Sequence, residues 1–321
     1  MKSTFKAGLK HEKLMEQETR NIDVLIEKAK ELYSQKQYDQ AIQCADEILK
    51  IEADNLVALK IKGKSLLLMD KLEQANSCYD SILARTPCDP KILKDKAFIL
   101  LRNGRLDEAN TFIHRSLDLD PKNYQSWFYQ AMIFFEKKDF PEALEFLDRS
   151  LELNNEQSQV WEKKADILYE MGKYEESLKC FDKAAALSID DPYLWKCSGN
   201  VCNQMDNYEK AIEYFQHSLE IKSDYVDALI GMAIAYTQQE KFDEALSYYD
   251  RALSHKPDNP DLWCRKGTIL GIMGEKDEAL SCYDRALGLD SSFREALLRK
   301  YFTLFHREKL FEAMQCFDQG L

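Results

Sequence analysis

Residues 242–256 read FDEALSYYDRALSHK, and residues 276–290 read KDEALSCYDRALGLD. The second stretch repeats most of the first, with position 242 corresponding to position 276. A unit of about 34 residues is too small to bury its own apolar face, so it must pack against the next copy. The two stretches therefore predict a repeat fold, provided that the repetition continues along the chain.

Small residues recur at two positions in successive copies. The first series steps at the same interval through Ala41, Ala75, Ala109, Ala143, Ser177, Ala211, Ala245, Ala279 and Ala313. The second series lies earlier in each copy, at Ala29, Gly63, Ala97, Ala131, Ala165, Gly199, Ala233 and Gly267, and is interrupted at Tyr301. Two small residues in each copy allow two helices to approach closely, and nine copies stay in register without an insertion.

The apolar residues of each copy have the spacing of a helical hairpin. Trp263, Gly267 and Leu270 lie at i, i+4 and i+7, on one face of a first helix. A turn follows, marked in three copies by Gly104, Gly172 and Gly274, and a second apolar stripe begins after it. At the start of later first helices, prolines are preceded by candidate capping residues, namely Asp89, Asp191 and Asn259.

These positions resemble those of the tetratricopeptide repeat (TPR). The resemblance is carried in one copy by Trp161, Ala165, Tyr169, Gly172, Tyr174, Phe181 and Ala184, and in another by Trp263, Gly267, Gly274, Ala279, Tyr283 and Ala286. It implies an all-α, right-handed superhelical α-solenoid of about nine 34-residue hairpins, whose first helices line a concave groove. A polar segment, residues 1–21, with alternating charge that is compatible with a helix, precedes the copies 22–55, 56–89, 90–123, 124–157, 158–191, 192–225, 226–259, 260–293 and 294–321, the last incomplete.

The composition indicates one acidic, helix-rich chain. It is 45% hydrophobic and 31% charged, its formal net charge is −12, and no linker rich in Gly, Ser or Pro divides it. A negative net charge disfavours indiscriminate binding to nucleic acid and to anionic membranes. No apolar run approaches the roughly 20 residues that a membrane-spanning helix needs, and residues 1–21 lack the apolar core of a signal peptide. We therefore expect one continuous, cytoplasmic protein without membrane contact.

The residues that carry chemistry in enzymes do not form a recognisable site. The five histidines lie apart, and no metal-ligand or phosphate-binding motif is present. Five of the nine cysteines share one repeat position, which aromatic residues occupy in the other copies: Cys44, Cys78, Cys180, Cys282 and Cys316. A position that accepts either residue type is a packing position. The sequence predicts no catalysis, no metal and no cofactor.

The side chains expected in the groove lie off the packing stripe of the first helices. The second and third copies supply a basic cluster: Lys60, Lys64, Lys91, Lys94 and Arg102. The third and fourth supply apolar side chains: Phe98, Phe128, Met132 and Phe135. Exposed apolar surface costs roughly 25 cal/mol per Å², so either a partner covers these side chains or they pack between adjacent first helices. The groove of the third and fourth copies is expected to dominate partner binding.

Later copies change in character. The fifth copy is acidic, with Glu162 and Asp166, and the sixth is polar, with Lys196, Asn200 and Asn203. Such a mosaic suits an extended peptide or a helix of a protein partner.

One scheme of the resembled family is tested by position. Its chaperone-binding members clamp the C-terminal carboxylates of a peptide with lysine, asparagine and arginine side chains. Lys196, Asn200 and Arg265 match that scheme, whereas Gly231 replaces an asparagine and Asp261 replaces a lysine. Because an aspartate repels the carboxylate, a working clamp is not expected.

The leading hypothesis is a non-catalytic interaction scaffold that holds a protein or peptide partner in the groove. A regulatory or substrate-selecting arm of a larger enzyme, such as a glycosyltransferase, is the alternative, and RNA binding through the basic cluster is a weaker one. Leu310, Phe317 and Leu321 are expected to lack a covering helix, and self-association, a longer natural chain and fraying remain open as explanations.

Overall fold

The computed structural model describes residues 21–306 and 312–314, and every regular element in these ranges is a helix. The chain divides into two compact units, Met1–Asn155 (unit 1) and Glu156–Leu321 (unit 2), and each is described by itself. The predicted polar segment, apart from Asn21, and the residues expected at an uncovered C-terminal end lie outside the described residues. One continuous solenoid over residues 22–321 stays a prediction.

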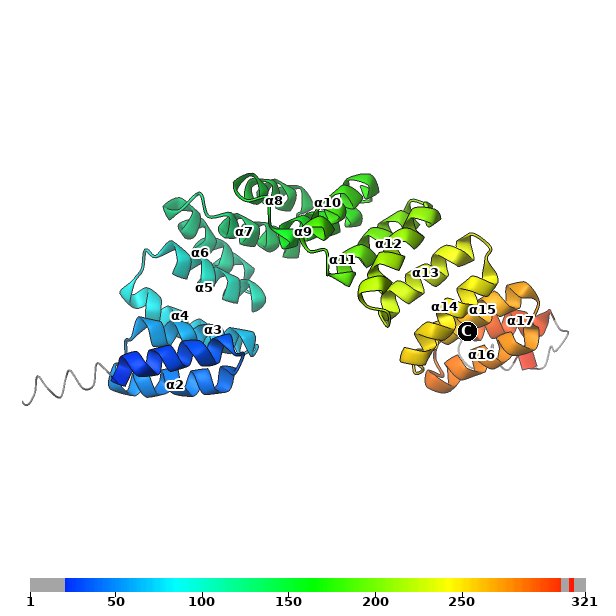
Figure 1. The fold of residues 1–321 in the computed structure, drawn as a ribbon, viewed down its shortest axis with the longest axis horizontal. Helices are drawn as coiled ribbons and strands as arrows, with labels where there is room; N and C mark the ends of the chain where they lie inside the picture. The colour runs from blue at the N-terminus through cyan, green and yellow to red at the C-terminus, as the bar shows by residue number, and fades with distance from the viewer. Residues whose placement is uncertain (1–20, 307–311, 315–321) are drawn as a thin grey trace, which may run out of the picture. The chain divides into compact units, whose positions relative to one another are not determined.

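Both units are built from consecutive helical hairpins (Figure 1). In unit 1, a helix over residues 21–34 is followed by α2 (Tyr38–Ile51), α3 (Leu56–Leu68), α4 (Leu72–Arg85), α5 (Pro90–Arg102), α6 (Leu106–Leu119), α7 (Tyr124–Glu136) and α8 (Phe140–Leu153). Unit 2 contains α9 (Ser158–Glu170), α10 (Tyr174–Leu187), α11 (Pro192–Gln204), α12 (Tyr208–Ile221), α13 (Val226–Gln238), α14 (Phe242–His255), α15 (Pro260–Met273), α16 (Lys276–Leu289) and α17 (Arg294–Phe305). The predicted all-α fold of stacked hairpins is confirmed.

First helices begin where a side chain satisfies their free amides. The side chains of all three predicted capping residues accept hydrogen bonds from backbone amides, as Asp89 does from Lys91 N at 2.9 Å. Asn55 and Asn123 do the same at the starts of α3 and α7. From α3 to α17, the first helices start at one repeat position, occupied in turn by Leu56, Pro90, Tyr124, Ser158, Pro192, Val226, Pro260 and Arg294.

The first helices from helix 21–34 to α15 end in a left-handed turn at the same repeat position. In the second copy Asp70 has φ 59°, and the Lys71 amide donates to the Leu66 carbonyl at 2.9 Å, as in a Schellman motif. The glycine turns predicted at Gly104, Gly172 and Gly274 are confirmed by φ values of 73°, 73° and 90°. The sequence analysis missed the same conformation at Lys36, Asp70, Lys138, Asp206 and Glu240.

Lys138→Gly is expected to stabilise unit 1 by about 0.5–1 kcal/mol. A lysine at φ 60° bears the steric cost of the left-handed conformation, whereas glycine adopts it freely. Thermal unfolding followed by circular dichroism measures the change, with Lys138→Ala as the control that keeps the strain. An unchanged or lower melting temperature for the glycine variant would contradict the prediction.

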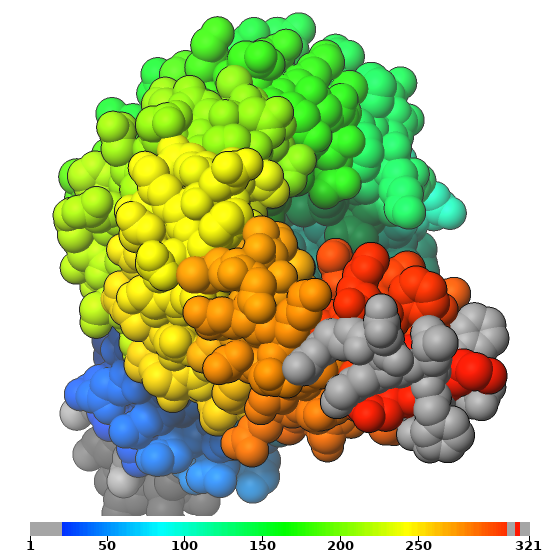
Figure 2. All heavy atoms as spheres, turned by 90° about the vertical axis from the view of Figure 1, so that its right-hand side faces the viewer, coloured from blue at the N-terminus to red at the C-terminus, as the bar shows by residue number. Residues whose placement is uncertain are grey.

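The small repeat positions admit aromatic rings between helices. Ala41, Ala75 and their equivalents are buried, and the rings of Tyr79, Phe215 and Tyr283 pack against Gly63, Gly199 and Gly267. Gly231 of α13 faces the Phe215 ring from the following copy, so that a Cβ there would lie 2.3 Å from Phe215 Cζ. In Figure 2 the atoms of α14 to α16, yellow to orange, form one continuous packed surface.

Ion pairs at one repeat register join a second helix to the following first helix. Each pair links an aspartate of the second helix to a lysine at the equivalent position of the next helix: Asp46 to Lys62, Asp80 to Lys96, Asp250 to Lys266 and Asp284 to Lys300. Where Ser198 replaces the lysine, the Tyr214 hydroxyl donates to the Asp182 carboxylate at 2.7 Å. This register holds successive copies in a fixed alignment.

Candidate functional site

The first helices of successive copies contact one another as well as their own hairpin partners. Such contacts join α5 to α7 in unit 1, and α11 to α13 and α15 to α17 in unit 2. First helices are thus neighbours on one side of each unit. We call this side of unit 1 the first-helix surface; it comprises helix 21–34, α3, α5 and α7.

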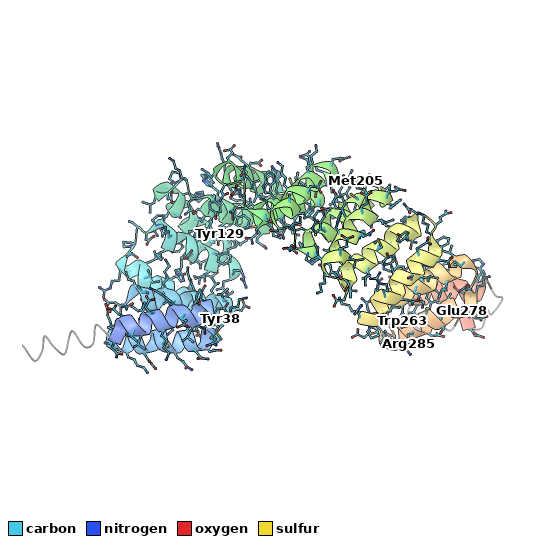
Figure 3. The ribbon with its side chains drawn as sticks, in the orientation of Figure 1. Tyr38, Tyr129, Met205, Trp263, Glu278 and Arg285 are labelled. Carbon is cyan, nitrogen blue, oxygen red and sulfur yellow. The ribbon has the colours of Figure 1, made fainter. Side chains whose placement is uncertain are left out.

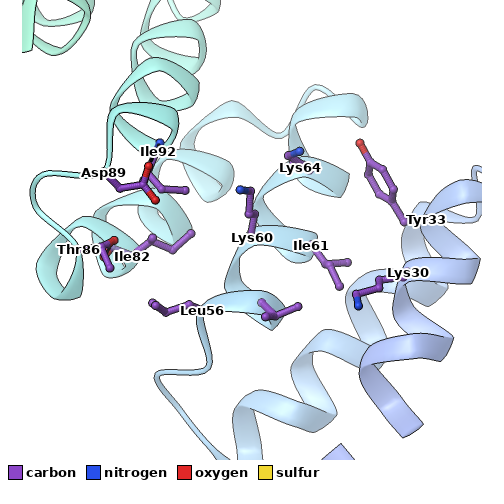
Figure 4. A pocket seen from close by; sticks show the side chains of 11 residues that line it. Lys30, Tyr33, Leu56, Lys60, Ile61, Lys64, Ile82, Thr86, Asp89 and Ile92 are labelled. Atoms are coloured by element: carbon purple, nitrogen blue, oxygen red, sulfur yellow. Dashed lines mark hydrogen bonds between the residues drawn. The ribbon is translucent and has the colours of Figure 1, made fainter. Parts of the chain in front are cut away.

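The first-helix surface contains a pocket of about 370 Å³. Side chains from helix 21–34, from α3 and from the segment that joins α4 to α5 surround it (Figure 4). The lining residues are Lys30, Tyr33, Leu56, Val57, Lys60, Ile61, Lys64, Ile82, Thr86, Asp89 and Ile92. Two of them, Lys60 and Lys64, were predicted as groove residues.

The pocket combines an apolar floor with exposed apolar edges. Ile61, Ile82 and Ile92 are buried beneath it. At its edge Leu56 is 37% and Val57 41% exposed, at the start of α3. The pocket therefore offers unused apolar contact area next to charged side chains.

The lysines of the pocket differ in how they are neutralised. Lys30 forms an ion pair with Glu27 at 2.7 Å. Lys60 and Lys64 have no ion pair within the described residues, and both are half-buried on α3. The only carboxylate of the lining, that of Asp89, already accepts hydrogen bonds from the first amides of α5.

The rest of the predicted basic cluster is used differently. Lys91 is exposed and does not line the pocket. Lys94 Nζ donates to Gln125 Oε1 at 2.6 Å and lies 3.3 Å from the Asp95 carboxylate. Arg102 pairs with Asp70 at 3.0 Å. The five basic residues thus do not form one free cluster, because Lys94 and Arg102 are bound to acceptors of their own chain.

The predicted aromatic cluster packs largely against its own chain. Phe98 stacks on Tyr129 with ring centroids 4.8 Å apart (Tyr129 is labelled in Figure 3), and burial raises the pKa of Tyr129 to about 12. Phe128 is only 8% exposed, and its ring lies against Tyr129 of the same helix, which agrees with the packed alternative to a covering partner. Met132 and Phe135 are half-buried. Of the four, Phe98 packs between neighbouring first helices, because Tyr129 belongs to the first helix of the next copy.

The acidic pair of unit 2 is neutralised by a lysine between its members. Lys163 Nζ lies 2.8 Å from Asp166 and 3.3 Å from Glu162. Burial raises the pKa of Glu162, and the neighbouring Lys163 charge offsets this only in part. The charged form of Glu162 is therefore less favourable in the folded state than in the unfolded chain.

Glu162→Gln is expected to stabilise unit 2 slightly at pH 7, by less than about 1 kcal/mol because the carboxylate is partly solvated. A carboxyl with a raised folded-state pKa loses its proton first in the unfolded chain, so stability falls as pH rises through the window above the unfolded pKa of 4.5. The variant removes that loss. Urea unfolding at pH 4 and pH 7 tests it: equal effects at both values would contradict the assignment.

The positions of the carboxylate clamp are not assembled. Lys196 Nζ lies 4.3 Å from the centroid of the Tyr193 ring, and Arg265 pairs with Asp261 at 2.7 Å. Asn200 is half-buried, and Asn203 Nδ2 donates to the Gly231 carbonyl at 3.3 Å. Gly231 stands where the clamp has its middle asparagine, and the Phe215 ring fills the space that a side chain at this position would need.

Nine of the eleven lining residues were not predicted as groove residues, among them Lys30, Tyr33, Leu56 and Val57. The groove positions were taken from the second copy onward, although Lys30 occupies the position of the first copy that corresponds to Lys64. Applying the same register to the first copy would have found Lys30 and Tyr33.

The remaining predictions concern packing and metals. Cys44, Cys78, Cys180 and Cys282 are buried thiols, which confirms their packing role, and Cys316 lies outside the described residues. Burial raises the pKa of Cys78 and of Cys282.

Among residues 21–306 and 312–314, no group of three His, Cys, Asp or Glu is placed to hold a metal. No helix formed by these residues is long and apolar enough to cross a membrane.

Tryptophan occupies one position of the first helix in four successive or near-successive copies, at Trp127, Trp161, Trp195 and Trp263, and Trp263 shows its contacts in unit 2. Its Nε1 donates to the Pro257 carbonyl at 2.8 Å, and the Arg285 guanidinium lies 5.5 Å from its ring centroid (Figure 3). Trp127 and Trp195 make the same bond to the carbonyl six residues earlier. These tryptophans tie the segment between copies to the following first helix.

Family models match four segments of the chain. Tetratricopeptide repeat models match residues 29–49, 190–258 and 260–293. A model described as anaphase-promoting complex, cyclosome, subunit 3 matches residues 102–184. A comparison with curated proteins found no match.

Solved structures with a similar fold have low sequence identity. A tetratricopeptide repeat protein from Parabacteroides merdae is 18% identical, with a TM-score of 0.58 over 72% of this chain and 91% of that chain. YrrB, described as a TPR protein with an unusual peptide-binding site, is 19% identical, with a TM-score of 0.50 over 59% of this chain and 97% of that chain. A chain of the APC/C hetero-tetramer Cut9–Hcn1 is 16% identical, with a TM-score of 0.56 over 88% of this chain but 56% of that chain. These likenesses show the fold.

Proposed function

This chain is a tetratricopeptide repeat protein, and from that premise we propose that it is a non-catalytic scaffold or adaptor that binds a peptide or helix of a protein partner on its first-helix surface. The observation that carries the proposal is the pocket of unit 1. There, exposed Leu56 and Val57 lie beside the unpaired lysines Lys60 and Lys64. Apolar contact area next to charges that lack partners is typical of a peptide-recognition surface.

Two further facts support the proposal. The structurally similar YrrB is described as having a peptide-binding site. The cysteines that the structure describes form no disulfide, which supports a reducing compartment such as the cytoplasm.

A random peptide library displayed on phage and selected on the full chain tests the proposal. The selection is expected to enrich peptides, and the test does not depend on their composition. Binding of these peptides should be lost in the Lys60→Glu, Lys64→Glu double variant. Lys122→Glu is the matched control, because this exposed lysine of unit 1 does not line the pocket. Each variant must keep its helical circular dichroism.

Two results would overturn the proposal. The first is a selection that enriches no peptide. The second is a set of enriched peptides that bind the double variant as tightly as the unmodified chain.

A further inference from the structure

We propose that the pocket of unit 1 selects an internal acidic peptide segment that carries one bulky apolar side chain, an inference that rests on the proposed function and specifies its ligand. The apolar side chain enters between Leu56, Val57 and the buried isoleucines. Acidic side chains on either side of it meet Lys60 and Lys64.

The volume and the lining admit the apolar side chain. An engineered apolar cavity of about 150 Å³ holds a benzene ring, and this pocket has about 370 Å³. Ile61, Ile82 and Ile92 form its floor, and the exposed faces of Leu56 and Val57 flank its entrance. When a leucine or phenylalanine of the ligand enters the pocket, its own apolar surface and that of these lining residues are both removed from water, which favours binding.

The charges define the flanking residues of the ligand. Three lysines and one aspartate line the pocket, and Asp89 is committed to capping α5. Lys60 and Lys64 lie at i and i+4 on one helix, where like charges repel each other. Lys62 of the same helix is instead neutralised by Asp46. The positive charge without a partner is thus confined to the side of α3 that faces the pocket, and an acidic ligand supplies the missing charge.

The ligand is a peptide rather than RNA, and its own side chains supply the acid. The uncharged polar groups of the lining are few, and the Thr86 hydroxyl already donates to the Ile82 carbonyl at 3.0 Å. Little remains to read the edge of a base, whereas the apolar floor suits an aliphatic or aromatic side chain. The lining also holds no asparagine or glutamine to clamp a terminal carboxylate, so the chain ends of the ligand are not required.

Isothermal titration calorimetry with three blocked synthetic peptides tests the inference. The probe has a central leucine between acidic residues, one matched peptide has alanine for the leucine, and the other has amides for the acids. The alanine peptide is expected to bind at least about tenfold more weakly, because it loses the burial of the leucine. Each of Lys60→Ala and Lys64→Ala should weaken the probe by up to about fivefold, and Lys122→Ala should not.

Several outcomes would overturn the inference and are distinct from failure of the proposed function. The inference fails if the amide peptide binds as well as the acidic one, or if the lysine variants bind the probe normally. It also fails if a single-stranded RNA oligonucleotide binds more tightly than the probe and is lost in the same variants. If the library yields peptides that depend on Lys60 and Lys64 but are not acidic, the proposed function stands and the inference alone is wrong.

Discussion

Replacing Gly231 by asparagine is expected to destabilise unit 2 by about 3 kcal/mol. A Cβ at this position would lie 2.3 Å from Phe215 Cζ and 2.4 Å from Cε1, far inside van der Waals contact. The ring has little room to retreat, because it is fully buried and Gly199 of α11 also lies against it, where a Cβ would be 2.6 Å from Cε1. Overpacking of a tight core costs about 1–3 kcal/mol, and a ring packed against two helices places this case at the upper end.

Gly288→Asn is the control for this prediction. Gly288 is exposed on α16 in the same unit, and an added Cβ there meets nothing within 4 Å. Its stability should change by less than about 0.5 kcal/mol. Urea unfolding followed by circular dichroism compares the two variants. Replacing the ring by a smaller side chain, Phe215→Leu, should recover part of the lost stability when combined with Gly231→Asn. Equal stability of Gly231→Asn and Gly288→Asn would contradict the packing argument.

The same geometry accounts for the missing clamp residue. An asparagine at position 231 would complete the middle of the carboxylate scheme, but the space for its side chain is filled by Phe215. We therefore expect Gly231→Asn to lose stability without gaining affinity for a peptide that ends in free carboxylates.

Asp80→Ala is expected to destabilise unit 1 by about 2–3 kcal/mol. The Lys96 side chain is 3% exposed, and its ammonium donates to Asp80 Oδ1 at 2.6 Å and to the Asn76 carbonyl at 3.3 Å. Removing the carboxylate leaves a buried charge with a single carbonyl, which costs about 3–5 kcal/mol for a fully buried pair. The effect is smaller here because Asp80 is 59% exposed and water replaces part of it.

The repeat supplies a matched control in the same unit. Asp46 and Lys62 form the equivalent pair one copy earlier, but the Lys62 side chain is 27% exposed. Asp46→Ala should therefore cost less than about 1 kcal/mol. A Lys96→Met, Asp80→Ala double variant should recover most of the stability, since no charge remains to be solvated. If Asp46→Ala and Asp80→Ala cost the same in chemical denaturation, burial of Lys96 does not set the energy.

Most of the fold was predictable because the repeat register is independent of local propensity. That register placed the starts of the first helices and the glycine turns. The turns at Lys138 and Glu240 were missed, because the local sequence there does not favour a left-handed residue and the packed hairpin imposes one. Their repeat position reveals them: Gly172 occupies it in the copy after Lys138, and Gly274 occupies it in the copy after Glu240.

Two positions of the candidate site were predicted from the repeat, but the exposures of the groove side chains were not. Lys60 and Lys64 were found because the repeat position indicates the direction of a side chain. The exposure of Phe98 depends on Tyr129, which belongs to the next copy, and that of Lys94 depends on Gln125. Contacts between copies of different sequence decide which groove side chains stay free, and periodicity alone does not contain them.

The distribution of tryptophans makes the two units separately visible to fluorescence. Trp127 is the only tryptophan of unit 1, whereas Trp161, Trp195 and Trp263 belong to unit 2. The indole of Trp127 is fixed by its hydrogen bond to the Pro121 carbonyl, so its emission should shift to longer wavelength when the loop before α7 is released into water. In a chain whose other three tryptophans are phenylalanine, red-shifted emission would report the melting of unit 1 alone.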